Sequence, residues 1–193
     1  MYRFNILKKS ISSIVTLTDE EFLVLCESFT LRKLAKNELF LEEGTICDYI
    51  GFVNSGILIY FQRKANCDEI TIDFSFEEDW VTVNQSRLTN SKSLISIKAI
   101  ETCELLVISQ KRLSELYIRI PKLERLGRIL MEQSFLKIAQ QSIDLQLLSA
   151  TDRYKKLLYH YPNILQRVPL YHIANYLGIA PKSLSRIRKQ LFD

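Results

Sequence analysis

The sequence lacks an apolar run long enough to cross a membrane. A transmembrane helix needs about 18 or more apolar residues in succession, and no segment of this 193-residue chain approaches that length. The N-terminal stretch MYRFNILKKSISSIV is apolar only in patches and contains no cleavage site made of small residues. We therefore expect a cytoplasmic protein with no signal peptide and no membrane partner.

Residue types that ligate metals or act as nucleophiles are also scarce. The two histidines, His160 and His172, have no nucleophile pattern near them, and the sequence contains neither a Cys-x-x-Cys pair nor zinc-finger spacing. We expect reduced, buried or half-buried thiols, no metal, no cofactor and no enzymatic activity. The cysteines are Cys26, Cys47, Cys67 and Cys103.

Acidic residues are few near the C-terminus. Residues 149–193 contain eight Lys and Arg but only two acids, which gives a net charge of +6, whereas residues 1–148 carry −2. A basic end on a slightly acidic body indicates that this end binds a polyanion.

The first two thirds of the chain show mainly the period of β-strands. Thr18 to Glu21 form a capping box that predicts one short helix. From about residue 30 to residue 109, apolar and polar residues alternate, as in Ile70 to Phe76. Asn54-Ser55-Gly56 is typical of a tight turn between two strands. About eight short strands in about 80 residues favour an antiparallel β-roll of the jelly-roll type.

A long apolar stripe at helical spacing follows Pro121. It predicts a helix of about 27 residues, close to 40 Å in length, which is longer than a domain of this size needs. The helix either packs along its own β-domain or meets a second copy of the chain, and we expect a dimer seam. The residues predicted at the dimer interface are Leu123, Leu126, Leu130 and Phe135.

The last 45 residues predict a helix-turn-helix. A second capping box at Ser149 starts a new helix, which Pro162 ends. Beyond Pro169, a small residue stands where two helices would cross, and a glycine stands where the turn needs a positive φ. The predicted helix-turn-helix core comprises Ile173, Ala174, Leu177, Gly178, Ile179, Leu184 and Ile187.

The second helix of this motif would expose a basic face. Its N-terminal half would enter a major groove, so Lys182, Ser183 and Arg186 are best placed for base edges. Arg188 and Lys189 would meet phosphates. The full set of predicted DNA-binding residues is Lys182, Ser183, Ser185, Arg186, Arg188 and Lys189.

The chain resembles the Crp/Fnr family of bacterial transcription regulators over nearly its whole length. Besides the helix-turn-helix, the resemblance rests on residues 41–44 (LEEG), 52–58 (FVNSGIL) and 103–109 (CELLVIS). It implies an α+β fold with a cyclic-nucleotide-binding-like β-roll sensor domain at residues 1–120, a long dimerisation helix at 121–148 and an all-α DNA-binding domain at 149–193. Family members regulate transcription and often contact RNA polymerase.

Two departures from the family pattern limit what the resemblance implies. The position expected for a phosphate-binding arginine falls at Ser93, next to Leu94, while Glu77, Glu78 and Asp79 would repel a phosphate. We therefore expect an effector other than cAMP, of unknown identity, or none. We also expect no β-hairpin wing after the recognition helix, and no Fnr-like cluster, because the N-terminal cysteine cluster is absent.

The sequence thus predicts a homodimeric regulator that reads a palindromic operator on double-stranded DNA. The alternative is a ligand- or partner-binding signalling module whose helix-turn-helix serves protein contacts. Only phosphate neutralisation makes binding to DNA steeply dependent on salt, so the salt dependence of DNA retention separates the two hypotheses.

Overall fold

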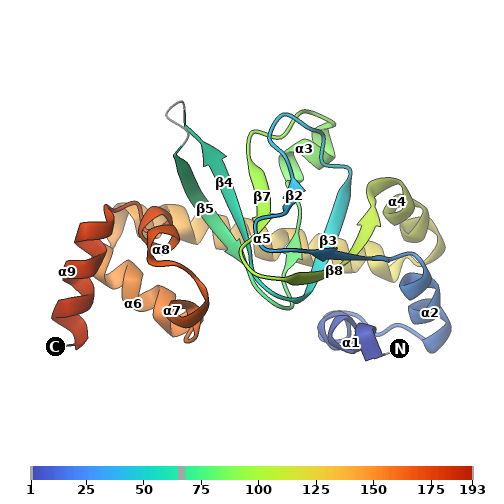
Figure 1. The fold of residues 1–193 in the computed structure, drawn as a ribbon. Helices are drawn as coiled ribbons and strands as arrows, with labels where there is room; N and C mark the ends of the chain where they lie inside the picture. Colours follow the sequence, from blue (N-terminus) through green and yellow to red (C-terminus); the bar gives the residue numbers. More distant parts are fainter. Residues whose placement is uncertain (1, 65–67, 193) are drawn as a thin grey trace.

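The chain folds into a β-roll, a long helix that runs along it, and a helical unit at the C-terminus (Figure 1). The computed structural model describes residues 2–64 and 68–192. Within them lie two four-stranded antiparallel sheets: sheet A in the order β1-β8-β3-β6 and sheet B in the order β2-β7-β4-β5. The α+β fold class is confirmed. The strands are β1 (Thr30–Leu34), β2 (Leu39–Leu41), β3 (Tyr49–Ser55), β4 (Leu58–Arg63), β5 (Glu69–Ser75), β6 (Trp80–Val81), β7 (Ser96–Ala99) and β8 (Cys103–Ser109).

Successive residues of a strand pack into two different apolar cores, one between the sheets and one on the outer face of a sheet. In β8, Leu105 points between the sheets and Leu106 points to the outer face of sheet A, and both are buried. The predicted tight turn is confirmed at Gly56, whose φ is +92° and where a Cβ would lie 2.6 Å from the carbonyl oxygen of Thr102. The predicted turn at Ala65-Asn66 lies outside the described residues, as does Cys67.

Helices from both ends of the roll cover the outer face of sheet A. The capping box at Thr18 is confirmed, with reciprocal hydrogen bonds of 3.1 and 2.7 Å to and from Glu21. α1, α3, α4 and α7 were not predicted. The helices are η1 (Tyr2–Phe4), α1 (Asn5–Ser12), α2 (Asp19–Glu27), α3 (Asn84–Thr89), α4 (Gln110–Arg119), α5 (Lys122–Leu147), α6 (Ala150–His160), α7 (Ile164–Arg167), α8 (Leu170–Tyr176) and α9 (Pro181–Phe192).

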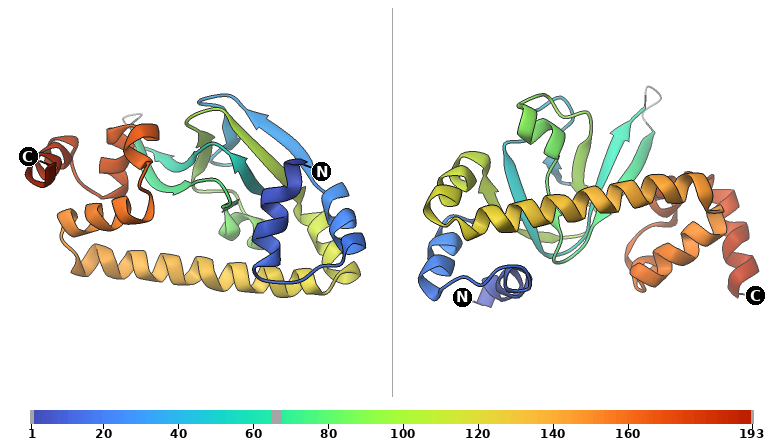
Figure 2. Two further views of the ribbon diagram at one scale, coloured as in Figure 1. Left: turned by 90° about the horizontal axis from the view of Figure 1, so that it is seen from below. Right: turned by 180° about the vertical axis from the view of Figure 1, so that it is seen from behind.

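The predicted long helix is confirmed as α5, which Figure 2 shows running from the α4 end of the roll to the C-terminal helices. Two of its predicted dimer residues require a correction. Leu123 and Leu126 are only 2% and 6% exposed, because they pack inside the protomer against the outer face of sheet A. Leu130 is half-buried against the same cluster. Phe135 is 71% exposed and remains open to a partner.

Beyond Leu130, the protomer-facing side of α5 becomes polar. Lys137 pairs with Asp73 of β5 at 2.9 Å. The side-chain amide of Gln141 donates to the hydroxyl of Tyr176 at 3.1 Å. The rest of the surface of this half exposes large apolar side chains, of which Leu145 also borders the junction with α6. They are Met131, Phe135, Leu136, Ile138, Ile143, Leu145 and Leu147.

The C-terminal helices cover the outer face of sheet B, and they share one apolar core with it. Tyr154 and Leu157 of α6 are buried in the same cluster as Ile59 of β4 and Phe74 of β5. The predicted start of α6 is confirmed by a 3.1 Å bond from the Asp152 amide to the Ser149 hydroxyl. The roll therefore has a sandwich interior and two covered outer faces.

Candidate nucleic-acid interface

A helix-turn-helix forms where the sequence predicts it. α8 and α9 are joined by a turn centred on Gly178, whose φ is +67°. The amides of Gly178 and Ile179 donate to the carbonyls of Asn175 and Ala174 at 2.9 and 3.0 Å, which ends α8. A side chain with a Cβ is strained at such a φ, so the glycine allows the chain to reverse direction here.

The predicted core positions of this motif lie against one another and are mostly buried. Ala174 is fully buried, and its small side chain allows the two helices to approach closely. Ile179 is half-buried, and Gly178 is exposed. The other core residues are also buried, namely Ile173, Leu177, Leu184 and Ile187.

The outer face of α9 carries exposed cations. Lys182, Arg186 and Lys189 are all exposed, and none of them forms an ion pair within residues 2–64 and 68–192. Ser183 is half-buried. Ser185 is exposed, but its hydroxyl donates to the carbonyl of Pro181 at 3.1 Å. The face is therefore open and positively charged.

Arg188 differs from the other predicted DNA-binding residues. It is half-buried, and its Nε is fully buried with no hydrogen-bond partner in the described part of the chain. Burial raises the pKa of the Tyr154 phenol, while the neighbouring Arg188 guanidinium acts in the opposite direction. Arg188 therefore lies over the core of the helical unit rather than on its outer face.

An arginine clasp fixes the helical unit to the roll. Arg167, at the end of α7, donates to both carboxylate oxygens of Glu77 at 2.6 and 3.0 Å and also bonds to Glu101. Glu77 further accepts from the Gly56 amide at 3.0 Å. Burial raises the pKa of Glu77, but the hydrogen bonds from Arg167, those from the backbone, including the Gly56 amide, and the charge of Arg167 together outweigh it and leave the pKa below its ordinary value. These two acids thus serve an intramolecular contact.

α8 docks directly on β5. Thr71 and His172 share a hydrogen bond of 2.6 Å, and the Asn175 amide donates to the backbone carbonyl of Glu69 at 2.9 Å. The aromatic rings of Phe74 and Tyr176 lie 5.1 Å apart. His172 is buried, and this burial lowers its pKa to about 4. A neutral imidazole at this contact holds α8 to the sheet at neutral pH.

Two residues at the position expected for a phosphate cassette are hydrogen-bonded within the fold. Ser93 is buried, its hydroxyl donates to the Ile95 carbonyl at 2.7 Å, and its amide donates to the Thr45 carbonyl at 2.8 Å. Asp79 accepts from the Phe76 amide at 2.9 Å. Both side chains therefore have structural partners in the roll.

The side chain of Tyr60 occupies part of the roll interior. It points from sheet B between the two sheets, and its hydroxyl lies 3.5 Å from the Ser75 hydroxyl and 3.4 Å from the Thr82 amide. Burial raises the pKa of Tyr60 to about 12. The phenol thereby joins β4 and β5 to the chain that follows β6.

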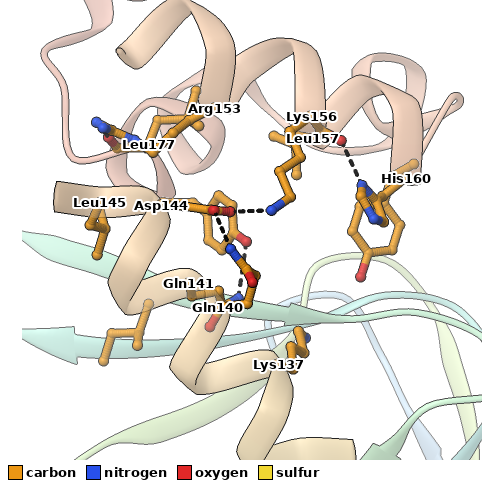
Figure 3. A pocket seen from close by; sticks show the side chains of 13 residues that line it. Lys137, Gln140, Gln141, Asp144, Leu145, Arg153, Lys156, Leu157, His160 and Leu177 are labelled. Carbon is orange, nitrogen blue, oxygen red and sulfur yellow. Dashed lines mark hydrogen bonds and ion pairs between the residues drawn. The ribbon is translucent and has the colours of Figure 1, made fainter. Parts of the chain in front are cut away.

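A cavity of about 320 Å³ lies at the junction between α5 and α6 (Figure 3). Its cations already have partners. Lys156 pairs with Asp144, Lys137 pairs with Asp73, and Arg153 donates to the carbonyls of Leu148 and Leu177 at 2.7 and 2.9 Å. The two lysines are thus compensated by acids, whereas Arg153 is held by neutral carbonyls and its buried Nε has no hydrogen-bond partner among the described residues.

Comparison with known proteins identifies the fold and the order of its parts. Residues 31–119 match the cyclic nucleotide-binding domain family. The transcriptional activator protein Anr of Pseudomonas protegens is 25% identical over 167 residues, which cover 81% of this chain and 68% of that protein. The roll is thus similar to cyclic nucleotide-binding domains, and most of the chain is similar to a transcriptional activator. In this chain the helix-turn-helix follows the roll and the long helix.

Solved structures share the fold of this chain. FixK2 from Bradyrhizobium japonicum aligns with a TM-score of 0.72 and 14% identity, over 84% of each chain. A structure described as a Crp/Fnr-family transcriptional regulator from Eubacterium rectale aligns with a TM-score of 0.69 and 16% identity, over 98% of this chain and 87% of that one. At these identities, the likeness establishes the fold alone.

Two further findings concern expected absences. No helix in residues 2–64 and 68–192 is both long and apolar enough to cross a membrane. In the same described residues, no three or more His, Cys, Asp or Glu side chains gather as metal ligands would.

Proposed function

We propose that this protein is a dimeric transcription regulator of the Crp/Fnr family that reads a palindromic DNA site with α9, one helix in each half-site. The open cationic face of α9 carries the proposal, because Lys182, Arg186 and Lys189 are exposed and have no acidic partner in the described chain. The proposal keeps the three parts at residues 1–120, 121–148 and 149–193.

The residues of α9 have different roles in this proposal. Arg186 reads a base, because its planar fork can bond both O6 and N7 of a guanine. Lys182 and Ser183 lie in the first turn of α9, the part that enters the groove first. Lys189 lies about one turn further on and neutralises a phosphate. Arg188 anchors the helix from behind and does not contact DNA.

The exposed apolar side of α5 supports the dimer. Four of its residues follow one another at intervals of four, three and seven residues, as in the seam of a coiled coil. They are Met131, Phe135, Ile138 and Leu145. Solvent-exposed apolar residues in such number on one helix typically mark a protein interface. The seam therefore runs along the second half of α5, and Leu123 and Leu126 belong to the protomer.

The test uses the unmodified dimer and a duplex selected by it from genomic fragments. Fluorescence anisotropy compares this duplex with a scrambled one at several salt concentrations. Arg186→Ala should weaken the selected duplex roughly 10- to 100-fold more than the scrambled one, since a bidentate base contact is worth about 1–3 kcal/mol. Lys189→Ala should weaken both alike and lower the salt slope by about one phosphate.

Arg125→Ala is the matched control, because Arg125 is an exposed arginine near the start of α5, at the end away from α9. It should bind both duplexes like the unmodified protein. Absence of salt-dependent binding by the unmodified dimer at low salt would overturn the proposal.

A further inference from the structure

A second cavity, of about 130 Å³, lies on the outer face of sheet A. It is distinct from the roll interior and from the junction cavity, since its walls come from α1, α2, α3, α4, the first half of α5 and the sheet. The walls are largely apolar. They include Ile11, Leu25, Ile50, Ile108, Leu113 and Leu130.

One side of this cavity is formed by Arg87, and its guanidinium has no counter-charge. Its two terminal nitrogens donate to neutral amide oxygens, those of Gln110 and, at 2.9 Å, of Asn84. Its Nε is fully buried and has no hydrogen-bond partner in the described part of the chain, and no acid there forms an ion pair with it. Burial lowers the pKa of Arg87 below its ordinary value.

Two more donors line the same cavity. The indole Nε1 of Trp80 is buried and has no partner among the described residues. Tyr117 approaches α5 closely at Gly127, where a Cβ would lie 2.5 Å from the Tyr117 hydroxyl. The glycine therefore makes room for a phenol at the cavity. An arginine, an indole and a phenol can all donate to an acceptor-rich group.

This arrangement calls for an anion with an apolar body. A buried charge without a partner is costly, and a carboxylate matches the guanidinium fork in charge and geometry. The apolar walls require that the rest of the molecule be apolar as well. The volume is close to that of engineered cavities of about 150 Å³ that bind benzene, so a single small ring or a short aliphatic chain fits.

We propose that this cavity binds a small monocarboxylic acid, with its carboxylate at Arg87 and its apolar body between sheet A and α5. The ligand class follows from the uncompensated guanidinium, the unpartnered indole donor and the apolar walls together. The site lies apart from α9, so binding of an acid there can be tested independently of DNA binding.

Trp80 supplies the assay, because it is the only tryptophan in the chain and it lines the cavity. The probe is sodium benzoate, titrated into the protein without DNA, with tryptophan emission as the readout and sodium chloride matching the ionic strength. Benzyl alcohol, which has a similar shape but no charge, is the paired probe. Isothermal calorimetry of both probes gives a second, independent measurement.

We expect saturable benzoate binding with a Kd of about 1 mM, since a ligand of this size gains on the order of 0.3–0.5 kcal/mol per non-hydrogen atom. Benzyl alcohol should bind at least about tenfold more weakly, because a charge-assisted bond is lost. Arg87→Gln should weaken benzoate at least about tenfold and leave benzyl alcohol unchanged. Arg125→Gln removes an exposed arginine from α5 and should change neither.

Three results would overturn the proposal: no saturable response to benzoate by fluorescence and calorimetry up to about 50 mM, equal affinity for the two probes, or undiminished benzoate binding by Arg87→Gln. If Arg87→Gln does not fold, as judged by circular dichroism, the comparison of the two probes on the unmodified protein decides alone.

Discussion

The two faces of α5 can be separated by substitutions that lie nine residues apart. Leu126 is 6% exposed and packs against the outer face of sheet A. Truncating a buried leucine to alanine costs about 2–5 kcal/mol, through lost burial and the cavity that remains. We expect Leu126→Ala to lower the free energy of unfolding by about 3 kcal/mol and to leave the dimer seam intact in the folded fraction.

Phe135 should behave in the opposite way. Its side chain is 71% exposed in the protomer, so a seam that covers it would bury roughly 140 Å² of a side chain of about 200 Å². At about 25 cal/mol per Å², this amounts to roughly 3.5 kcal/mol for each copy. Even if half is offset by ordering costs, Phe135→Ala should weaken the dimer at least 100-fold.

Sedimentation velocity over a dilution series measures the dimer, and urea unfolding measures the protomer. Unfolding should be compared at concentrations low enough for every variant to be monomeric, because association adds stability by mass action. Under those conditions, Phe135→Ala should change the unfolding free energy by less than about 0.5 kcal/mol. A dimer unaffected by Phe135→Ala, or a well-folded monomer produced by Leu126→Ala, would refute this assignment of the two faces.

Three further outcomes follow from the contacts of the roll. Arg167→Gln should lower the unfolding free energy, measured by thermal melts, by about 1–2 kcal/mol, because it leaves two half-exposed acids unpaired. The control is Arg128→Gln, which removes an exposed ion pair with Glu132 and should change the unfolding free energy by less than about 0.5 kcal/mol. The pKa of His172 falls to about 4 in the fold, below its unfolded value of 6.5. Its contribution should therefore be complete above pH 6.5 and lost as the pH falls toward 4, by up to about 3 kcal/mol. The urea midpoint of the unmodified protein should fall over this pH range, and that of His160→Gln should fall by the same amount. A urea midpoint that does not change with pH would contradict this role of His172. Calorimetry with cAMP and cGMP at about 1 mM should show no saturable heat, and binding in the micromolar range would mean that the roll holds a phosphate without an arginine at Ser93.

Local sequence rules predicted the parts of the molecule that depend on local physics. The alternation in Ile70 to Phe76, the glycine after Asn54-Ser55 and the long stripe after Pro121 all produced the expected elements. The helix-turn-helix was predictable because its turn requires a positive φ at Gly178 and its crossing requires a small residue at Ala174. Each of these constraints acts within a few residues of the chain.

Contacts between distant segments were not predictable in this way. Arg167 and Glu77 are separated by 90 residues in sequence, and only the fold brings them together. Leu126 faces the protomer and Phe135 faces solvent, because nine residues of an α-helix place the two side chains on opposite sides of α5. Burial of His172 likewise depends on β5, which contributes no signal to the local sequence. The acids at 77–79 were recognised as a cluster in the sequence, but the contact of Glu77 with Arg167 was not predicted.

The shared core on sheet B constrains how the proposed DNA-reading unit can be exchanged. The helical unit does not enclose its own apolar interior, since Leu157 and Ile173 lie in one cluster with Ile59 and Phe74 of the roll. A DNA-reading unit transplanted from another protein would have to match these strand side chains as well as the junction. New operator preferences are therefore more accessible by exchanging exposed side chains of α9, such as Lys182 and Arg186, than by shuffling whole domains.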